Sequence, residues 1–267
     1  MKDSGVAVAY PGLPLIFAEG FSDYKKRISG HSHASFALTD LQDMVRTETR
    51  AQLIPAGVEI QVEGVEEANP RMQSAHSVVR EMLGLAAGKT GISLMSKNQN
   101  ILTGSSDSGA AALVASVDDT LELGLPYHKL EEYARKISET AYRSIYGGLS
   151  EYTVDDRGNI STNQLKKASY FKDVVIYAVP FELKRFSADD LHLRVSQHPR
   201  YNQRNDQVNV RLSELKETLG SGDIVSILRL MELDAKTVHQ MFADMGMTVI
   251  REGMKDFTVK IDDLRAT

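Results

Sequence analysis

Hydrophobic and polar positions alternate along two early segments of the chain in the way that half-buried strands do. These segments are 44–53 (MVRTETRAQL) and 57–65 (GVEIQVEGV), and each predicts a strand with one face toward a core. The run 6–18 (VAVAYPGLPLIFA) is almost continuously apolar and contains two prolines. It predicts a buried strand or a pair of strands broken at the prolines. This run is too short to cross a bilayer and lacks the basic start of a signal peptide.

Two later segments place apolar residues at helical spacing. The segment 72–86 predicts a helix, and its buried stripe comprises Ala75, Val78, Val79, Met82 and Leu83. A second helix is expected from about Tyr127 to Ser144, and its stripe comprises Leu130, Ala134, Ile137 and Ala141. The sequence DDRGN at 155–159 predicts a hairpin turn. The first part of the chain therefore mixes strands and helices.

A continuous apolar stretch opens the second half of the chain. Residues 171–182 (FKDVVIYAVPFE) predict a buried strand. Two helical patterns follow at 205–219 and 223–245, and the sequence GSGD separates them. Asp223 in that linker is suited to cap the second helix.

Composition and charge exclude several classes of function. The 267 residues carry a net charge of −5 and no long basic run, so an extended nucleic-acid footprint is not expected. The chain has no cysteine, which excludes disulfides, thiolate nucleophiles and zinc-thiolate sites and fits a reducing compartment such as the cytoplasm. His31 and His33 have no carboxylate at ligand spacing, so we expect loop residues there rather than a metal site.

Small polar residues stand directly before an alanine-rich apolar run in the segment 101–119 (ILTGSSDSGAAALVASVDD). Small residues at a helix N-terminus let backbone N–H groups approach an anion, and the helix dipole favours negative charge there. The segment therefore suits a phosphate, although it matches neither the Walker pattern nor G-x-G-x-x-G. The alternative is a serine-rich loop that only caps a buried helix. The carboxylate of Asp107 would repel a phosphate unless a cation lay between them.

Three stretches, taken in order, resemble one known family. They are AYPGLPLIFAEGFSDYKKRI (9–28), ILTGSSDSGAAAL (101–113) and SETAYRSIYGG (138–148). Together they resemble the GHMP kinase superfamily in its branch of diphosphomevalonate decarboxylases and mevalonate 3-kinases, and most of all the archaeal, Thermoplasma-type mevalonate 3-kinases. The resemblance implies a two-domain α+β fold. Its N-terminal half, residues 1–170, is ribosomal protein S5 domain 2-like and binds the nucleotide, and residues 171–267 form a ferredoxin-like, substrate-side half that is shortened at its C-terminus.

The resemblance also implies roles for individual residues. The residues expected to bind the cofactor ATP are Asn98, Thr103, Gly104, Ser105, Ser106 and Asp107. The expected catalytic residues are Glu139 and Arg185, and the expected substrate-binding residues are Arg143, Ser144 and Phe17. A surface ion pair one helical turn apart is the alternative for Glu139 and Arg143. Phe17 stands where the decarboxylases carry a lysine, so the resemblance favours a kinase.

We therefore expect an enzyme that uses ATP and Mg²⁺ to phosphorylate the 3-hydroxyl of mevalonate. The alternatives are a decarboxylase of diphosphomevalonate or mevalonate 3,5-bisphosphate, a small-molecule kinase with another acceptor, and a relative that binds ligands without turnover. The expected partners are mevalonate or a phosphorylated mevalonate and a second copy of the chain in a homodimer. Nucleic acid and membrane are not expected partners.

Overall fold

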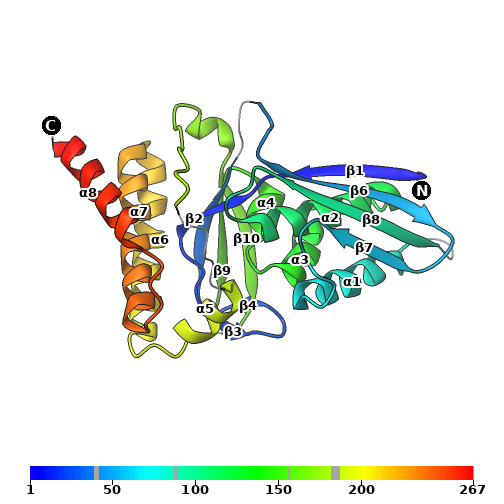
Figure 1. Ribbon diagram of the computed structural model, residues 1–267, viewed down its shortest axis with the longest axis horizontal. Helices are drawn as coiled ribbons and strands as arrows, with labels where there is room; N and C mark the ends of the chain where they lie inside the picture. Colours follow the sequence, from blue (N-terminus) through cyan, green and yellow to red (C-terminus); the bar gives the residue numbers. More distant parts are fainter. Residues whose placement is uncertain (39–41, 87–89, 156, 182–186, 267) are drawn as a thin grey trace.

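The computed structural model describes residues 1–38, 42–86, 90–155, 157–181 and 187–266, and Figure 1 shows their arrangement. A first sheet lies at one end of the molecule, a second sheet lies in the middle, and a group of helices covers the other end (Figure 1). The mixture of sheets and helices confirms the predicted α+β class. Among the described residues, no helix has the length and apolar composition needed to span a bilayer.

The first sheet has the strand order β1-β6-β8-β7. Its strands are β1 (Ser4–Ala9), β6 (Arg46–Ile54), β7 (Val58–Val62) and β8 (Gly91–Gln99). Only the β7–β8 pair is parallel, and α1 (Pro70–Leu83) connects these two strands, as parallel neighbours require a crossover. The alternating patterns at 44–53 and 57–65 and the helical pattern at 72–86 are therefore confirmed.

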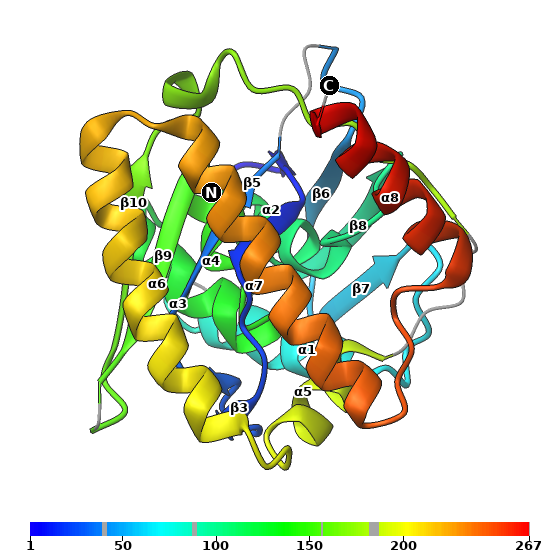
Figure 2. The same ribbon diagram turned by 90° about the vertical axis from the view of Figure 1, so that its left-hand side faces the viewer.

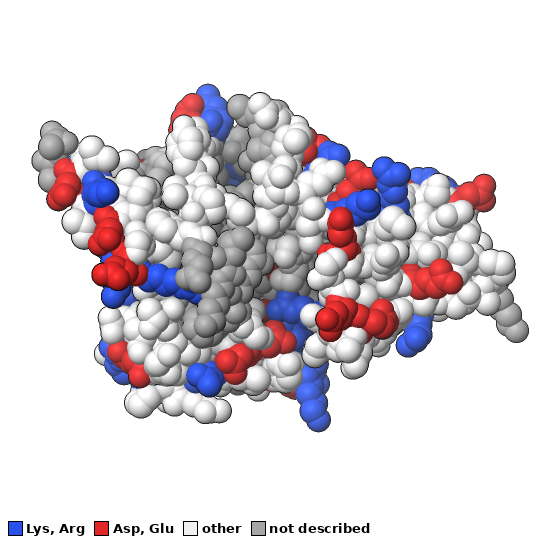
Figure 3. All heavy atoms as spheres, viewed as in Figure 1, with Lys and Arg blue, Asp and Glu red and all other residues white. Residues whose placement is uncertain are grey.

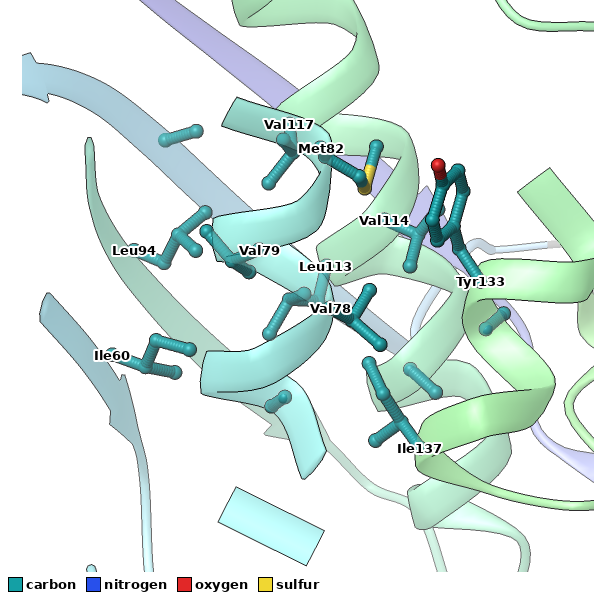
Figure 4. Close-up of a cluster of buried hydrophobic side chains, with 14 of the residues drawn as sticks. Ile60, Val78, Val79, Met82, Leu94, Leu113, Val114, Val117, Tyr133 and Ile137 are labelled. Carbon is teal, nitrogen blue, oxygen red and sulfur yellow. The ribbon is translucent and has the colours of Figure 1, made fainter. Parts of the chain in front are cut away.

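Three helices pack together over the first sheet. They are α1, α2 (Ser105–Leu121) and α3 (Tyr127–Ile137). Figure 4 shows Val78 and Met82 of α1 meeting Val114 of α2 and Tyr133 of α3 in one cluster of buried side chains. The small alanines of α2 bring its backbone close to β1 and β6. This core fixes the N-terminal end of α2 relative to α1.

The second sheet is antiparallel, with the strand order β10-β9-β5-β2. Its strands are β2 (Gly12–Ile16), β5 (His33–Ala37), β9 (Leu149–Val154) and β10 (Ile160–Lys166). The apolar run 6–18 forms two strands, β1 and β2, and the register of β2 shifts after Pro14. The hairpin predicted at 155–159 joins β9 to β10. A short hairpin of β3 (Phe21–Asp23) and β4 (Ile28–Ser29) stands beside this sheet.

The predicted helix 127–144 is wrong at its C-terminal end. α3 stops at Ile137, and a separate short helix, α4, spans Tyr142–Tyr146. The backbone of Ser138 is extended, with φ −139°. The hydroxyls of Ser138 and Thr140 donate to the buried carboxylate of Asp107. These two hydrogen bonds connect the turn between α3 and α4 to α2.

Beyond a short 3₁₀ turn, η1 (Ala168–Phe171), and an irregular segment, the described residues from Ala188 onward form helices. These helices are α5 (Ala188–Val195), α6 (Tyr201–Ser221), α7 (Ile224–Asp244) and α8 (Glu252–Ala266), and Figure 2 views them from their own end of the molecule. α6 and α7 confirm the two predicted helices, and the Asp223 side chain accepts a hydrogen bond from the Ser226 N–H as the predicted cap. Both helices pack on the second sheet.

The strand predicted at 171–182 does not form in its described residues. Residues 172–181 belong to no helix or sheet, and the side chains of Val175 and Tyr177 are 69% and 86% exposed. A strand needs a neighbour to satisfy its backbone, and the described part of the chain after β10 supplies none. The sheet of a ferredoxin-like half is therefore not seen among these residues. The domain boundary at residue 170 stays a prediction.

Candidate functional site

A cavity of about 810 Å³ lies between the helices of the first sheet and α5. The N-terminal ends of α1, α2 and α5 all reach its wall, because Arg71, Ser105 and Asp189 each line it. Since each helix N-terminus carries partial positive charge, the cavity is suited to an anion. On the face drawn in Figure 3, by contrast, positive and negative side chains are interspersed without a continuous patch of either sign.

The loop before α2 is held by a close backbone contact. Gly104, the N-cap of α2, has φ +73°, and a Cβ at this position would lie 2.5 Å from the backbone oxygen of Gly12. Only glycine fits there without strain. No side chain caps this helix start, so its first N–H groups are not taken by a capping side chain. This geometry is suited to binding a phosphate.

Five of the six residues predicted to bind the nucleotide line the cavity. They are Asn98, Thr103, Gly104, Ser105 and Ser106. Their role in nucleotide binding stays a prediction. The sixth, Asp107, is not among the lining residues, and it is 1% exposed.

Asp107 forms a buried ion pair with Arg143. Its carboxylate accepts hydrogen bonds from the hydroxyls of Ser138 and Thr140, both at 2.7 Å, and from Arg143 Nε at 2.9 Å and Nη2. Arg143 Nη1 also donates to Ser35 Oγ at 3.1 Å. The negative charge that was expected to repel a phosphate is thus compensated inside the protein.

The other residues predicted to bind substrate lie elsewhere. Phe17 packs in an apolar cluster with residues of α5 and α7, and its ring meets His239 edge to face at 5.7 Å. Ser144 Oγ donates to the backbone oxygen of Tyr10. Neither residue lines the cavity. Arg185 lies outside the described residues.

Glu139 lies next to the cavity in a buried ionic cluster. Glu139 Oε2 accepts a hydrogen bond from Arg27 Nε at 2.9 Å and forms an ion pair with Arg27 Nη2 at 2.7 Å. Glu139 Oε1 lies 3.5 Å from His192 Nε2 and 3.8 Å from Arg71 Nη2. Glu139 is therefore not paired with Arg143, and the alternative of a surface ion pair one helical turn apart does not hold.

Asp189 joins the same cluster from the wall of the cavity. Arg27 holds the Asp189 carboxylate through both terminal nitrogens, and Arg71 Nη2 donates to it at 3.0 Å. The Tyr24 hydroxyl adds a fourth hydrogen bond, at 3.1 Å. Asp189 thereby fastens α5 to the N-terminal part of the chain.

The cluster keeps its carboxylates ionised. Burial alone would raise the pKa of Glu139, but neighbouring His192, Arg71 and Arg27 outweigh burial and lower this pKa to about 2. The pKa of Asp189 is also lowered, because hydrogen bonds and charges of Arg27 and Arg71 outweigh burial. Burial lowers the pKa of His192 itself, so the two arginines are the cations that remain at neutral pH.

A second buried cluster lies where β2 leads toward β3. Asp234 of α7 is fully buried and accepts hydrogen bonds from Arg204 and Arg211 of α6 and from the Phe17 N–H. Glu19 Oε2 is buried 3.8 Å from Arg204 Nη2 and has no hydrogen-bond partner among the described residues. Burial raises the pKa of Glu19 to about 8, although Arg204 opposes this shift.

Sequence reasoning did not single out Arg27, Arg71, Asp189 or His192. One signal was available for Arg71, because Asn69 followed by proline predicts a helix start, and Asn69 does cap α1. No local pattern indicates that Arg27 pairs with Asp189, since 162 positions separate them.

Two family models match the chain. Residues 9–163 match the diphosphomevalonate decarboxylase-like N-terminal domain, and residues 187–267 match the mevalonate-3-kinase C-terminal domain. The chain is 30% identical to mevalonate 3-kinase of Thermoplasma acidophilum, over 93% of this chain and 78% of that protein. It is 28% identical to mevalonate-3-kinase of Picrophilus torridus, over 96% of this chain and 81% of that protein.

A solved structure has a similar fold over the whole chain. The crystal structure of the Thermoplasma acidophilum mevalonate-3-kinase with mevalonate 3-phosphate and ADP bound superposes with a TM-score of 0.87 at 26% identity. The match covers 100% of this chain and 83% of that one.

Proposed function

Since the chain belongs to the family with a diphosphomevalonate decarboxylase-like N-terminal domain, we propose that it is a kinase that transfers the γ-phosphoryl group of ATP to the 3-hydroxyl of mevalonate. One observation carries this proposal: the uncapped start of α2 and the cluster around Glu139 adjoin one cavity. A phosphate donor and a hydroxyl acceptor can therefore be held within reach of each other.

ATP fits the start of α2. The phosphates would lie against the N–H groups that follow Gly104, where Ser105 and Ser106 leave room for a close approach. No group of three acidic or histidine side chains among the described residues is placed to hold a metal ion. We therefore propose that Mg²⁺ arrives bound to the nucleotide, where it neutralises phosphate charge during transfer.

Glu139 is the proposed acceptor of a hydrogen bond from the 3-hydroxyl. A carboxylate with a pKa of about 2 is a weak base, so it positions the hydroxyl more than it removes its proton. Positioning suffices, because a loose phosphoryl-transfer transition state requires little base catalysis. Arg185 remains the proposed partner of the substrate's negative charge. Arg143 already binds Asp107 and Ser35. Its proposed contact with the substrate carboxylate therefore requires the Arg143 side chain to give up one of these partners.

Phe17 supports a kinase over a decarboxylase. In this chain the position carries an aromatic ring that packs against α7, so it supplies no cation to the substrate. The decarboxylases of the branch carry a lysine there, and expulsion of phosphate and carbon dioxide calls for extra cationic groups.

Product analysis tests the proposal. The protein is incubated with ATP, Mg²⁺ and mevalonate, and ADP release, phosphorus NMR and carbon dioxide are measured together. We expect ADP and mevalonate 3-phosphate in equal amounts and no carbon dioxide. Carbon dioxide release from a phosphorylated mevalonate would instead identify a lyase, and ADP release with only another acceptor would identify a different kinase. The absence of turnover with all acceptors would indicate a ligand-binding relative.

A further inference from the structure

The ring of His192 has a defined tautomer. The Gly20 N–H donates to His192 Nδ1 at 3.1 Å, and a ring nitrogen can accept a hydrogen bond only through its lone pair. The proton of the neutral ring must therefore be on Nε2. A doubly protonated ring would place an N–H against the Gly20 N–H, so this contact also disfavours the charged form.

The surroundings of His192 favour the same neutral form. Its side chain is 14% exposed, and the ring lies against Phe21 with centroids 4.9 Å apart. The charged groups that face it are Glu139, Asp189, Arg27 and Arg71, and burial outweighs the two carboxylates and lowers its pKa. His192 thus provides an oriented N–H instead of a third positive charge.

The nitrogen that carries this proton lies near one oxygen of Glu139. Oε2 accepts a hydrogen bond from Arg27 Nε at 2.9 Å and lies 2.7 Å from Arg27 Nη2 in an ion pair. Oε1 lies 3.5 Å from His192 Nε2, a separation that shortens readily when a ligand completes a site. The two oxygens therefore differ, because Oε2 anchors the side chain and Oε1 keeps capacity for a further hydrogen bond.

We propose that His192 is a positioning residue that orients Glu139, so that Oε1 is the atom that accepts the hydrogen bond from the substrate hydroxyl. This inference rests on the proposed function and adds the acceptor atom and the group that directs it. His192 lies one turn after Asp189 on α5. The ion pairs of Asp189 hold this helix at the cavity wall, and the same helix places His192 Nε2 near Glu139.

Two variants separate this role from a structural one. His192→Asn keeps an acceptor for the Gly20 N–H but loses the donor toward Glu139, and His192→Gln places an amide nitrogen near the position of Nε2. We expect His192→Asn to lower kcat for mevalonate phosphorylation about tenfold or more, with the KM for ATP changed less than about twofold. His192→Gln restores most of the lost kcat. Exposed His128, changed to Asn, is the control and keeps wild-type kinetics.

The outcomes are distinct. Equal loss of kcat and equal loss of Tm in the Asn and Gln variants would indicate a structural role and overturn the inference, as would wild-type kinetics in both. A wild-type protein that does not phosphorylate mevalonate would overturn the proposed function and the acceptor role of Oε1 together.

Nitrogen-15 NMR of histidine-labelled protein determines the tautomer of His192 and requires no turnover, and the His192→Gln variant assigns the signal. We expect an unprotonated Nδ1 throughout the neutral pH range, and a His192 ring that gains a second proton there would contradict the neutral donor.

Discussion

Glu19 is a buried carboxyl group whose pKa, about 8, lies far above its usual value of 4.5. The folded state therefore holds a proton between about pH 4.5 and 8 that the unfolded state releases, so this residue lowers the stability of the fold as the pH rises through that interval. We expect Glu19→Gln to remove this pH-dependent loss of unfolding free energy, which is on the order of a few kcal/mol. The Tm advantage of the variant over wild type should grow from about pH 5 to about pH 8.5. Exposed Glu59, changed to Gln, is the control, and a constant difference across pH would contradict the assignment.

Asp107 and Arg143 make a second residue-scale prediction. Asp107→Asn keeps a group that can accept from Ser138 and Thr140 but leaves a buried guanidinium uncompensated, so we expect the free energy of unfolding to fall by about 3 kcal/mol or more. Asp119→Asn is the matched control on the same helix, because Asp119 pairs with Lys2 at the surface and should change stability by less than about 1 kcal/mol. Urea denaturation followed by circular dichroism measures both variants. Equal small effects would mean that the buried pair is dispensable.

Some site residues could be predicted from the sequence next to them, and others depend on partners that are distant in the sequence. Gly104, Ser105 and Ser106 could be placed at a phosphate-suited helix start from sequence, because the loop and the helix are consecutive. The pairing of Asp107 with Arg143 could not, since 36 positions separate them and each has a plausible local role. Glu139 was identified through a family resemblance, but its partner Arg27 lies 112 positions away, and neither composition nor spacing indicates that contact.

At the scale of elements, the start of α2 depends on two glycines in contact. Gly104→Ala would add strain at φ +73° and drive a Cβ against the backbone of Gly12, so we expect a loss of about 2 kcal/mol or more in unfolding free energy. Gly220→Ala in α6 is the control, because a Cβ there meets no atom within 4 Å and a helical alanine stabilises by up to about 1 kcal/mol. Thermal unfolding compares the two variants. An unchanged unfolding free energy in Gly104→Ala would show that the loop before α2 adjusts to the added Cβ.

Element prediction succeeded where burial alone determines the pattern. α1, α6 and α7 each present an apolar stripe to a sheet or a neighbouring helix, and that stripe can be read from spacing. The helix expected at 127–144 ends early, and hydrogen bonds from Ser138 and Thr140 connect the turn after it to Asp107, a residue of another helix. The strand expected at 171–182 has the right composition, but a strand also requires a neighbour, which its own sequence does not specify.

At the scale of the whole molecule, a bound nucleotide should stabilise the fold. Removing metal with EDTA is expected to leave the Tm of the ligand-free protein unchanged. ATP with Mg²⁺, at about 100 times its Kd, should raise stability by about 2.7 kcal/mol, a Tm increase of about 5–10 °C. ATP with excess EDTA should give a smaller rise. Scanning calorimetry measures all four states. An EDTA-induced drop without nucleotide would reveal a structural metal.

The segment after η1 has a consequence for the behaviour of the protein in concentrated solution. Val175, Ile176, Tyr177 and Val179 are between 48% and 86% exposed, on a stretch of backbone that belongs to no sheet. The same stretch of a second molecule can supply the neighbouring strand that the described residues do not, because exposed apolar segments of high β-propensity promote cross-molecular β-structure. Loss of soluble protein should therefore accelerate with concentration even where the fold itself is intact, and turbidity would rise before any change in Tm.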